Sequence, residues 1–167
     1  MTFLEIAIRT LSATPQRVAE LLAGVGESEL SRRPAGDFFS LRENVLHLRD
    51  IDMDGYEPRI ERILTESHPH FFDIDGARLA VERDYNNQAL RPALEAFAQS
   101  RQRSIERLRN ASEADLDRTA ELEPVGTVTL LVLLERWMEH DEGHLRDIEA
   151  LLSGAGFCVA AGVLARR

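Results

Sequence analysis

Four long stretches of the chain repeat an apolar residue at every third or fourth position, which is the spacing of one face of an α-helix. They cover roughly residues 2–23, 40–64, 77–110 and 127–152. No run of alternating apolar and polar residues is long enough to predict a β-strand. Because amphipathic helices bury their apolar stripes by packing side by side, the sequence predicts an all-α four-helix bundle over residues 1–152, followed by a tail at 153–167.

Capping residues and prolines predict where these helices begin and bend. Ser40, followed three residues later by Glu43, is a capping-box pattern at the start of the second helix. Pro15 could begin a new helix and so split the first stretch in two. Because proline cannot donate a backbone N–H, Pro92 predicts a bend in the third helix or a restart near Leu90.

Charge and composition exclude several classes of function. The chain has 29 acidic and 20 basic residues, a net charge of −9 that would repel a phosphate backbone, so no nucleic-acid partner is expected. Every basic residue is Arg, which excludes a Walker A lysine and a pyridoxal phosphate Schiff base. The single cysteine, Cys158, allows neither an internal disulfide nor a thiolate metal cluster. No apolar run reaches about 20 residues, so we expect a soluble, cytoplasmic protein without a membrane partner.

The fourth stretch carries two histidines on its apolar face. His140 and His144 are four residues apart, so their rings lie one helical turn from each other. The same face carries Leu130, Leu133, Trp137, Ile148 and Leu151. Two neutral imidazoles at this spacing can bind one metal ion, as in the HExxH helices of zinc enzymes. Asp141 stands where those enzymes have their general-base Glu, so the pattern here is HxxxH alone.

A third histidine, His47, lies in the second stretch beside its apolar face. If the second and fourth helices are neighbours, His47 could supply a third ligand, and three histidines plus water form the open coordination of a catalytic metal site. Asp141, Glu139 and Asp50 are the carboxylates that could orient these rings from behind. The alternative is a set of core histidines that are hydrogen-bonded within the bundle and bind no metal.

The other polar and aromatic candidates have structural interpretations. His68 and His70 lie in a connector, where a solvated loop or a cap over a pocket is expected rather than a ligand pair. The run from Arg101 to Arg109 predicts a solvated helix face with ion pairs between residues four apart. Tyr85 and Trp137 are expected in the core.

Three segments resemble the DinB-like family, whose members are also called YfiT-like metal-dependent hydrolases. They are Asn44–Leu48 with its histidine, His140–His144 with its HxxxH pair, and Asp75–Asn86, which is similar to the start of that family's third helix. The resemblance covers roughly residues 1–152. It implies an up-down-down-up four-helix bundle with long connectors.

The resemblance also implies a cofactor and partners. It implies a divalent metal ion, nickel or zinc, held by His47, His140 and His144, with no catalytic group beyond water bound to the metal. Members of the family commonly form homodimers. Some relatives are transferases or isomerases that use a low-molecular-weight thiol such as mycothiol, bacillithiol or glutathione.

Two classes of function therefore remain open. The first is a metal-dependent hydrolase or thiol-dependent transferase acting on a small molecule. The second is a non-catalytic metal-binding or stress-related interaction protein, in which a fourth protein ligand would close the metal site. The acidic net charge disfavours an anionic co-substrate unless arginines line the mouth of the pocket.

Overall fold

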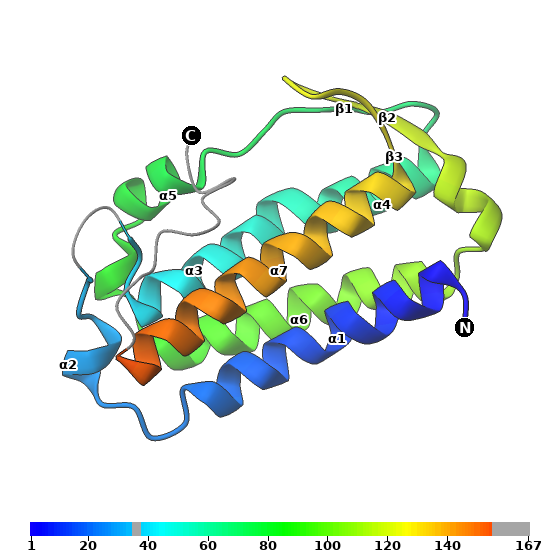
Figure 1. Cartoon of the computed structure of the whole chain (residues 1–167). Helices are drawn as coiled ribbons and strands as arrows, with labels where there is room; N and C mark the ends of the chain where they lie inside the picture. The colour runs from blue at the N-terminus through cyan, green and yellow to red at the C-terminus, as the bar shows by residue number, and fades with distance from the viewer. Residues whose placement is uncertain (35–37, 155–167) are drawn as a thin grey trace.

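The computed structural model describes residues 1–34 and 38–154, in which four long helical segments lie side by side (Figure 1). They are α1 (Phe3–Leu21), the continuous run of α3 (Leu41–Asp50), π-helix η1 (Ile51–Tyr56) and α4 (Glu57–Thr65), α6 (Leu90–Arg109), and α7 (Leu130–Ser153). The second and third segments run opposite to the first and fourth, so the predicted all-α up-down-down-up bundle is confirmed. The expected tail after Gly154, with Cys158, lies outside the described residues.

Local sequence signals set the helix starts. The side chains of Ser40 and Glu43 form the predicted capping box at the start of α3, and Thr129 caps α7. Pro15 does not split the first segment, because α1 continues through it from Phe3 to Leu21. The π-helix η1 ends at Tyr56, two residues before Pro58, which has no N–H to continue the regular pattern.

The third predicted stretch is divided in two. Helix α5 (Gly76–Glu82) is followed by the short η2 (Tyr85–Asn87), and α6 restarts at Leu90 as predicted. The chain turns at Asp84, whose φ of 48° places it in the left-handed region. This turn lets α5 lie against α3 instead of extending α6 (Figure 1). The single-turn helix α2 (Glu27–Leu30) lies in the connector before α3.

A small sheet at one end of the bundle was not predicted (Figure 1). Strand β1 (His70–Phe71) pairs in parallel with β2 (Thr119–Leu122), which pairs antiparallel with β3 (Gly126–Thr129). The 3₁₀-helix η3 (Glu113–Asp117) leads into β2. Strands of two to four residues are too short for an alternating pattern to show in the sequence. No helix of residues 1–34 or 38–154 is long and apolar enough to span a membrane.

The apolar core of the bundle is divided into two clusters along its axis. On α6, Phe97 belongs to one cluster and Ile105 to the other, with Arg101 between them. On α7 the same break falls between Trp137 and Leu145. The middle of the bundle is therefore a polar layer, and it contains the three predicted histidines.

Candidate metal centre

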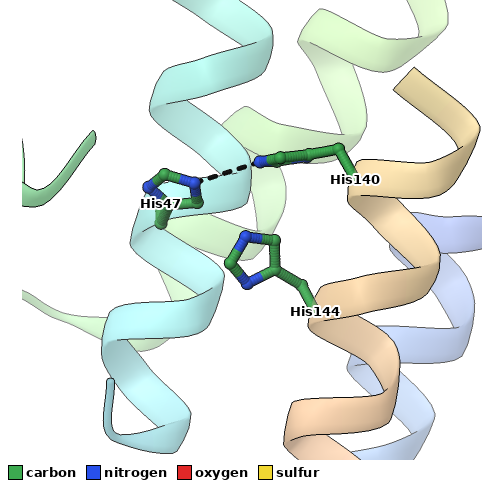
Figure 2. Close-up of side chains that lie close together, drawn as sticks. All are labelled: His47, His140 and His144. Atoms are coloured by element: carbon green, nitrogen blue, oxygen red, sulfur yellow. Dashed lines mark hydrogen bonds between the residues drawn. The ribbon is translucent and has the colours of Figure 1, made fainter. Parts of the chain in front are cut away.

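The structure brings the three histidines together between α3 and α7 (Figure 2). His47 Nε2 lies 3.0 Å from His140 Nε2. The ring centroids are 5.2 Å apart for His47 and His140, and 4.6 Å apart for each of the pairs that include His144. One nitrogen from each ring lies within 4.8 Å of the other two. These residues are called the three-histidine cluster below.

The helices position the rings for simple reasons. On α7, His140 and His144 are one turn apart and face the same side. His47 lies two turns into α3, whose start is fixed by the capping box of Ser40. Helix α5 covers His47 from the other side, since a Cβ added at Gly76 would lie only 2.2 Å from His47 Cε1. Glycine is therefore required there for α5 to approach the ring.

Asn44 fixes the orientation of the His144 ring, a role that we did not predict. Asn44 Nδ2 donates to the Ser40 carbonyl at 2.9 Å, which turns Asn44 Oδ1 towards His144 Nδ1 at 2.7 Å. Because this oxygen only accepts, His144 Nδ1 carries the proton and Nε2 keeps its lone pair for a ligand. The available signal was an amide at a buried position, one turn before His47, on the apolar face of α3.

The electrostatics keep His47 and His144 neutral. Burial lowers the pKa of His47 well below its usual value, and the charges of His144 and His140 add to this shift. Burial lowers the pKa of His144 to about 3, with a further contribution from His140. A neutral imidazole is the form that binds a metal ion.

The nitrogen positions also suit a metal ion. Two nitrogens that bind one zinc ion tetrahedrally, with bonds of about 2.0–2.1 Å, lie about 3.3 Å apart, close to the separation of His47 and His140 Nε2. Nδ1 of His47 and Nδ1 of His140 are buried without a hydrogen-bond partner among the described residues. Buried polar atoms are normally paired, so the cluster is less completely hydrogen-bonded than an ordinary set of core histidines.

Asp141, one of the three carboxylates predicted to support the rings, is bound mainly to another group. Its Oδ1 lies 3.8 Å from His140 Nδ1, beyond hydrogen-bond distance, while both its oxygens accept bonds from Arg101. Burial would raise the pKa of Asp141, but the charge of Arg101 lowers it to about 2. Asp141 is thus an ionised carboxylate beside His140 that belongs first to a separate network.

The other two predicted carboxylates, Asp50 and Glu139, make no hydrogen bond to the histidine rings among the described residues. Asp50 accepts hydrogen bonds from Arg49 Nε at 2.5 Å, Arg83 Nη1 at 2.7 Å and the Tyr85 hydroxyl at 2.8 Å. These bonds hold the chain after α5 against α3. Glu139 is exposed and makes no hydrogen bond to a described residue.

The predicted solvated face from Arg101 to Arg109 is wrong at its first residue. The side chain of Arg101 is 1% exposed and donates to Asp52 at 2.8 and 3.0 Å and to Asp141 at 2.7 and 3.1 Å. Trp137 Nε1 also donates to Asp52, at 3.0 Å. Arg101, Asp52, Asp141 and Trp137 are called the Arg101 network below. Arg101 is buried because it occupies a core-facing position of α6 and meets two carboxylates there.

The network also explains how α1 tolerates its proline. Pro15 has no N–H to donate to the Leu11 carbonyl one turn earlier. Arg101 Nη1 donates to that carbonyl instead, at 2.6 Å. The helix therefore continues through Pro15 without leaving a buried carbonyl unpaired.

The remaining histidines lie outside the cluster. His68 Nδ1 lies 2.9 Å from Thr119 Oγ1, and His70 Nε2 lies 2.9 Å from a carboxylate oxygen of Glu123. Both pairs join the connector after α4 to the small sheet. The structural interpretation of these two residues is consistent with their partners.

Comparisons with known proteins agree with this fold. The family model of the DinB superfamily matches residues 10–148. A protein of Halalkalibacterium halodurans named "Putative metal-dependent hydrolase" is 24% identical over 152 residues, which cover 89% of this chain and 86% of that protein. The solved structure of YfiT from Bacillus subtilis, described as a probable metal-dependent hydrolase with an unusual four-helix bundle topology, superposes with a TM-score of 0.83. The two chains are 21% identical, and the superposition covers 92% of this chain and 87% of YfiT. Because the family model matches residues 10–148, which are most of the chain, the chain belongs to the DinB superfamily.

Proposed function

We propose that the chain is a metal-dependent hydrolase of a small molecule, with one divalent ion, zinc or nickel, held by His47, His140 and His144. The observation that carries this proposal is the convergence of three imidazole rings between α3 and α7, with one nitrogen of each ring within 4.8 Å of the other two. The names given to the two relatives support the same class of reaction. Bound there, such an ion would lower the pKa of a water molecule and polarise a substrate oxygen.

The surroundings of the cluster support a catalytic rather than a purely structural site. Among the described residues the cluster holds three ligand side chains and no fourth. Structural zinc sites are closed by four protein ligands, whereas catalytic sites keep one position open. The His140 side chain is 23% exposed, so the cluster is reachable from solvent on that side. The chain's own part is to hold His47 and His144 neutral, to fix the His144 tautomer through Asn44, and to cover His47 from behind with α5.

Elemental analysis of protein purified without a histidine tag tests the metal site. We expect one divalent ion per chain after loading with zinc or nickel, and loss of that ion in His47→Ala and in His140→Ala. His68→Ala is the matched control and should keep the ion, because His68 binds the small sheet instead. A wild type that retains neither metal after loading and dialysis would contradict the proposal.

The reaction itself needs a second measurement. Metal-loaded protein should hydrolyse members of a panel of small esters and amides in water, and His144→Ala should not. Turnover only when a low-molecular-weight thiol is added would identify a thiol-dependent transferase instead. A stoichiometric ion with no turnover under either condition would identify a non-catalytic metal-binding protein.

We also propose that the protein is a homodimer, as the family resemblance implies. Exposed apolar side chains that a partner could cover are present on the connectors, including Phe72 and Val81. Sedimentation at tens of micromolar protein should therefore give twice the chain mass. A monomer at that concentration would contradict this part of the proposal.

A further inference from the structure

Two arginines follow the three-histidine cluster along the seam between α4 and α7. The two helical segments are antiparallel, so moving forward along one means moving backward along the other. Beyond the histidines, Tyr56 stacks on Trp137 with a centroid distance of 4.6 Å and an interplanar angle of 9°. The next residues on this seam that carry charge are Arg59 on α4 and Arg136 on α7. Arg136 is one turn before His140 and lies on the same helix face.

Arg59 is buried but only partly bound. Its side chain is 10% exposed, and Nη2 donates to the Phe72 carbonyl at 2.6 Å. The nearest carboxylate oxygen, Asp73 Oδ1, lies 4.0 Å away. Nε and Nη1 make no hydrogen bond to a described residue. Because a guanidinium has five N–H donors, most of its hydrogen-bonding capacity is left for a ligand.

Arg136 has no partner at all in the described part of the chain. It is half-buried and makes neither an ion pair nor a hydrogen bond there. Burial lowers the pKa of Arg59, and the positive charge of Arg136 adds to that shift, so the two guanidinium groups repel each other. In a chain with a net charge of −9, two like-charged arginines beside an open site are best explained by an anion that binds between them.

Tyr56 connects these arginines to the cluster. Its ring centroid lies 6.1 Å from that of His140. Its hydroxyl makes no hydrogen bond to a described residue. Burial raises the pKa of the Tyr56 hydroxyl, and the charges of Arg59 and Arg136 both act on it against that shift, so Tyr56 is a neighbour that the cluster and the two arginines share.

We propose that Arg59 and Arg136 bind an oxyanion group of the substrate while the bond to be hydrolysed lies at the three-histidine cluster. The substrate class is thus a small ester or amide that carries a carboxylate or a phosphate a few atoms from the scissile bond. The planar fork of a guanidinium matches both anions. The pair would supply the positive charge that an anionic substrate needs on a chain with a net charge of −9. This inference rests on the proposed function.

Metal-binding hydroxamates of different charge test the inference on the zinc-loaded full chain. Acetohydroxamate has a neutral tail, succinic monohydroxamate has a carboxylate tail, and 3-phosphonopropionohydroxamate has a phosphonate tail. We expect at least one anionic probe to bind about tenfold more tightly than acetohydroxamate, since hydrogen bonds between a guanidinium and an anion are among the stronger ones in proteins. The probe that gains more identifies the anion as a carboxylate or a phosphate.

Variants separate the arginines from the metal site. Arg136→Gln should remove the preference for the anionic probe while leaving the affinity for acetohydroxamate and the zinc content unchanged. Arg59→Gln should act in the same direction. Arg146→Gln is the matched control, because Arg146 is exposed on α7 and donates only to the Glu142 carbonyl.

The outcomes distinguish the two proposals. Zinc bound at one ion per chain, with equal affinity for neutral and anionic probes, would overturn the inference and leave the proposed function intact. A preference that survives in both Arg136→Gln and Arg59→Gln would also overturn it. A wild type that binds no zinc would remove the proposed function itself.

Discussion

The three-histidine cluster and the Arg101 network lie next to each other in the polar layer, yet they differ in how completely their polar groups are paired. Arg101 binds two carboxylates and a carbonyl through charged hydrogen bonds of 2.6 to 3.1 Å. Its guanidinium also lies over the rings of Phe97 and Trp137, at 5.0 and 4.6 Å. In the cluster, by contrast, His47 and His140 each bury an Nδ1 that has no hydrogen-bond partner in the described part of the chain.

This difference separates a structural polar group from a functional one. Burying a polar group costs free energy unless it is hydrogen-bonded, so a network that pairs its own groups can serve stability without any ligand. The Arg101 network links α1, η1, α6 and α7 in this way. The cluster brings together three rings from α3 and α7, and two of their buried nitrogens lack a partner among residues 1–34 and 38–154, so it is less completely paired than the Arg101 network.

Removing the cation of the Arg101 network should have the largest effect on stability. Arg101→Met leaves two buried carboxylates and the Leu11 carbonyl without their donor. Breaking a buried ion pair in this way typically costs about 3–5 kcal/mol. Urea denaturation at pH 7 should show that loss in the free energy of unfolding.

Arg103→Gln is the matched control on the same helix. Arg103 binds Glu57 at 2.6 Å, but its side chain is 46% exposed, so its loss should cost at most about 1 kcal/mol. If the two variants lose equal stability, the network is no more important than a surface ion pair, and the comparison fails.

The Arg101 network shows what the sequence could have revealed and why it did not. The charged run from Arg101 to Arg109 suggested a solvated face, because sequence spacing within one helix cannot show which carboxylates face it from other helices. Asp52 and Asp141, however, also lie at core-facing positions of their helices. Charges at core positions of three different helices must pair with one another, and that pattern was readable before the fold was known.

Removing one ring of the cluster should have the next largest effect, and only when metal is present. A ligand that binds only the folded state at 100 times its dissociation constant stabilises it by about 2.7 kcal/mol, which for a chain of this size raises the melting temperature by several degrees. EDTA should therefore lower the melting temperature of the zinc-loaded wild type by that amount. His144→Ala should abolish the EDTA effect, and His70→Ala should keep it. An unchanged wild-type melting temperature with and without EDTA would favour core histidines that bind no metal.

The distance between α5 and the cluster gives a smaller and more specific test. Gly76→Ala places a Cβ 2.2 Å from His47 Cε1, so either the ring or α5 must move. Because displaced ligands and their supporting groups commonly cost 10–100-fold in metal affinity, we expect about tenfold weaker zinc binding by calorimetry.

Gly143→Ala is the matched control, on α7 beside the cluster. A Cβ at Gly143 would meet no atom within 4 Å, and alanine favours a helix over glycine by up to about 1 kcal/mol. This variant should melt higher and keep its zinc affinity. Equal zinc affinities in Gly76→Ala and Gly143→Ala would show that α5 does not hold His47 in place.

The residues that support the three rings could not be predicted from the sequence, for a geometric reason. The HxxxH pair on α7 was found from its spacing within one helix, whereas His47 on α3 was joined to that pair through the resemblance to the DinB-like family. Asn44 and Gly76 act through contacts between segments that the chain separates, so no single window contains them with their partners. Pro92 indicated the break before α6. It did not indicate the consequence of that break, which is that α5 lies against His47.

Titration of the metal-free protein should distinguish the two regions by the sign of its effect. The pKa values of His47 and His144 are lowered in the folded state, so the unfolded chain takes up protons first as the pH falls through about 6.5, and stability is lost. Burial raises the pKa of Asp52 from 3.8 to about 6, and the nearby charge of Asp141 adds to this shift against the attraction of Arg101. The folded state therefore takes up that proton first, and stability is gained as the pH falls through about 6.

These opposite effects should offset each other only in part in the wild type between pH 7 and pH 6. With an unfolded-state pKa of about 6.5, each of the two histidines loses about 0.7 kcal/mol over this range, whereas Asp52 gains about 0.3 kcal/mol, so the free energy of unfolding of the wild type should fall by about 1 kcal/mol. Asp52→Asn removes the gain, and its stability should fall more steeply with decreasing pH than that of the wild type. His144→Ala removes half of the loss, and its stability should fall less steeply than that of the wild type. Urea denaturation in EDTA at the two pH values measures all three slopes, with His68→Ala as the unchanged control. Identical slopes for Asp52→Asn and His144→Ala would mean that the cluster and the network do not respond to protons in opposite directions.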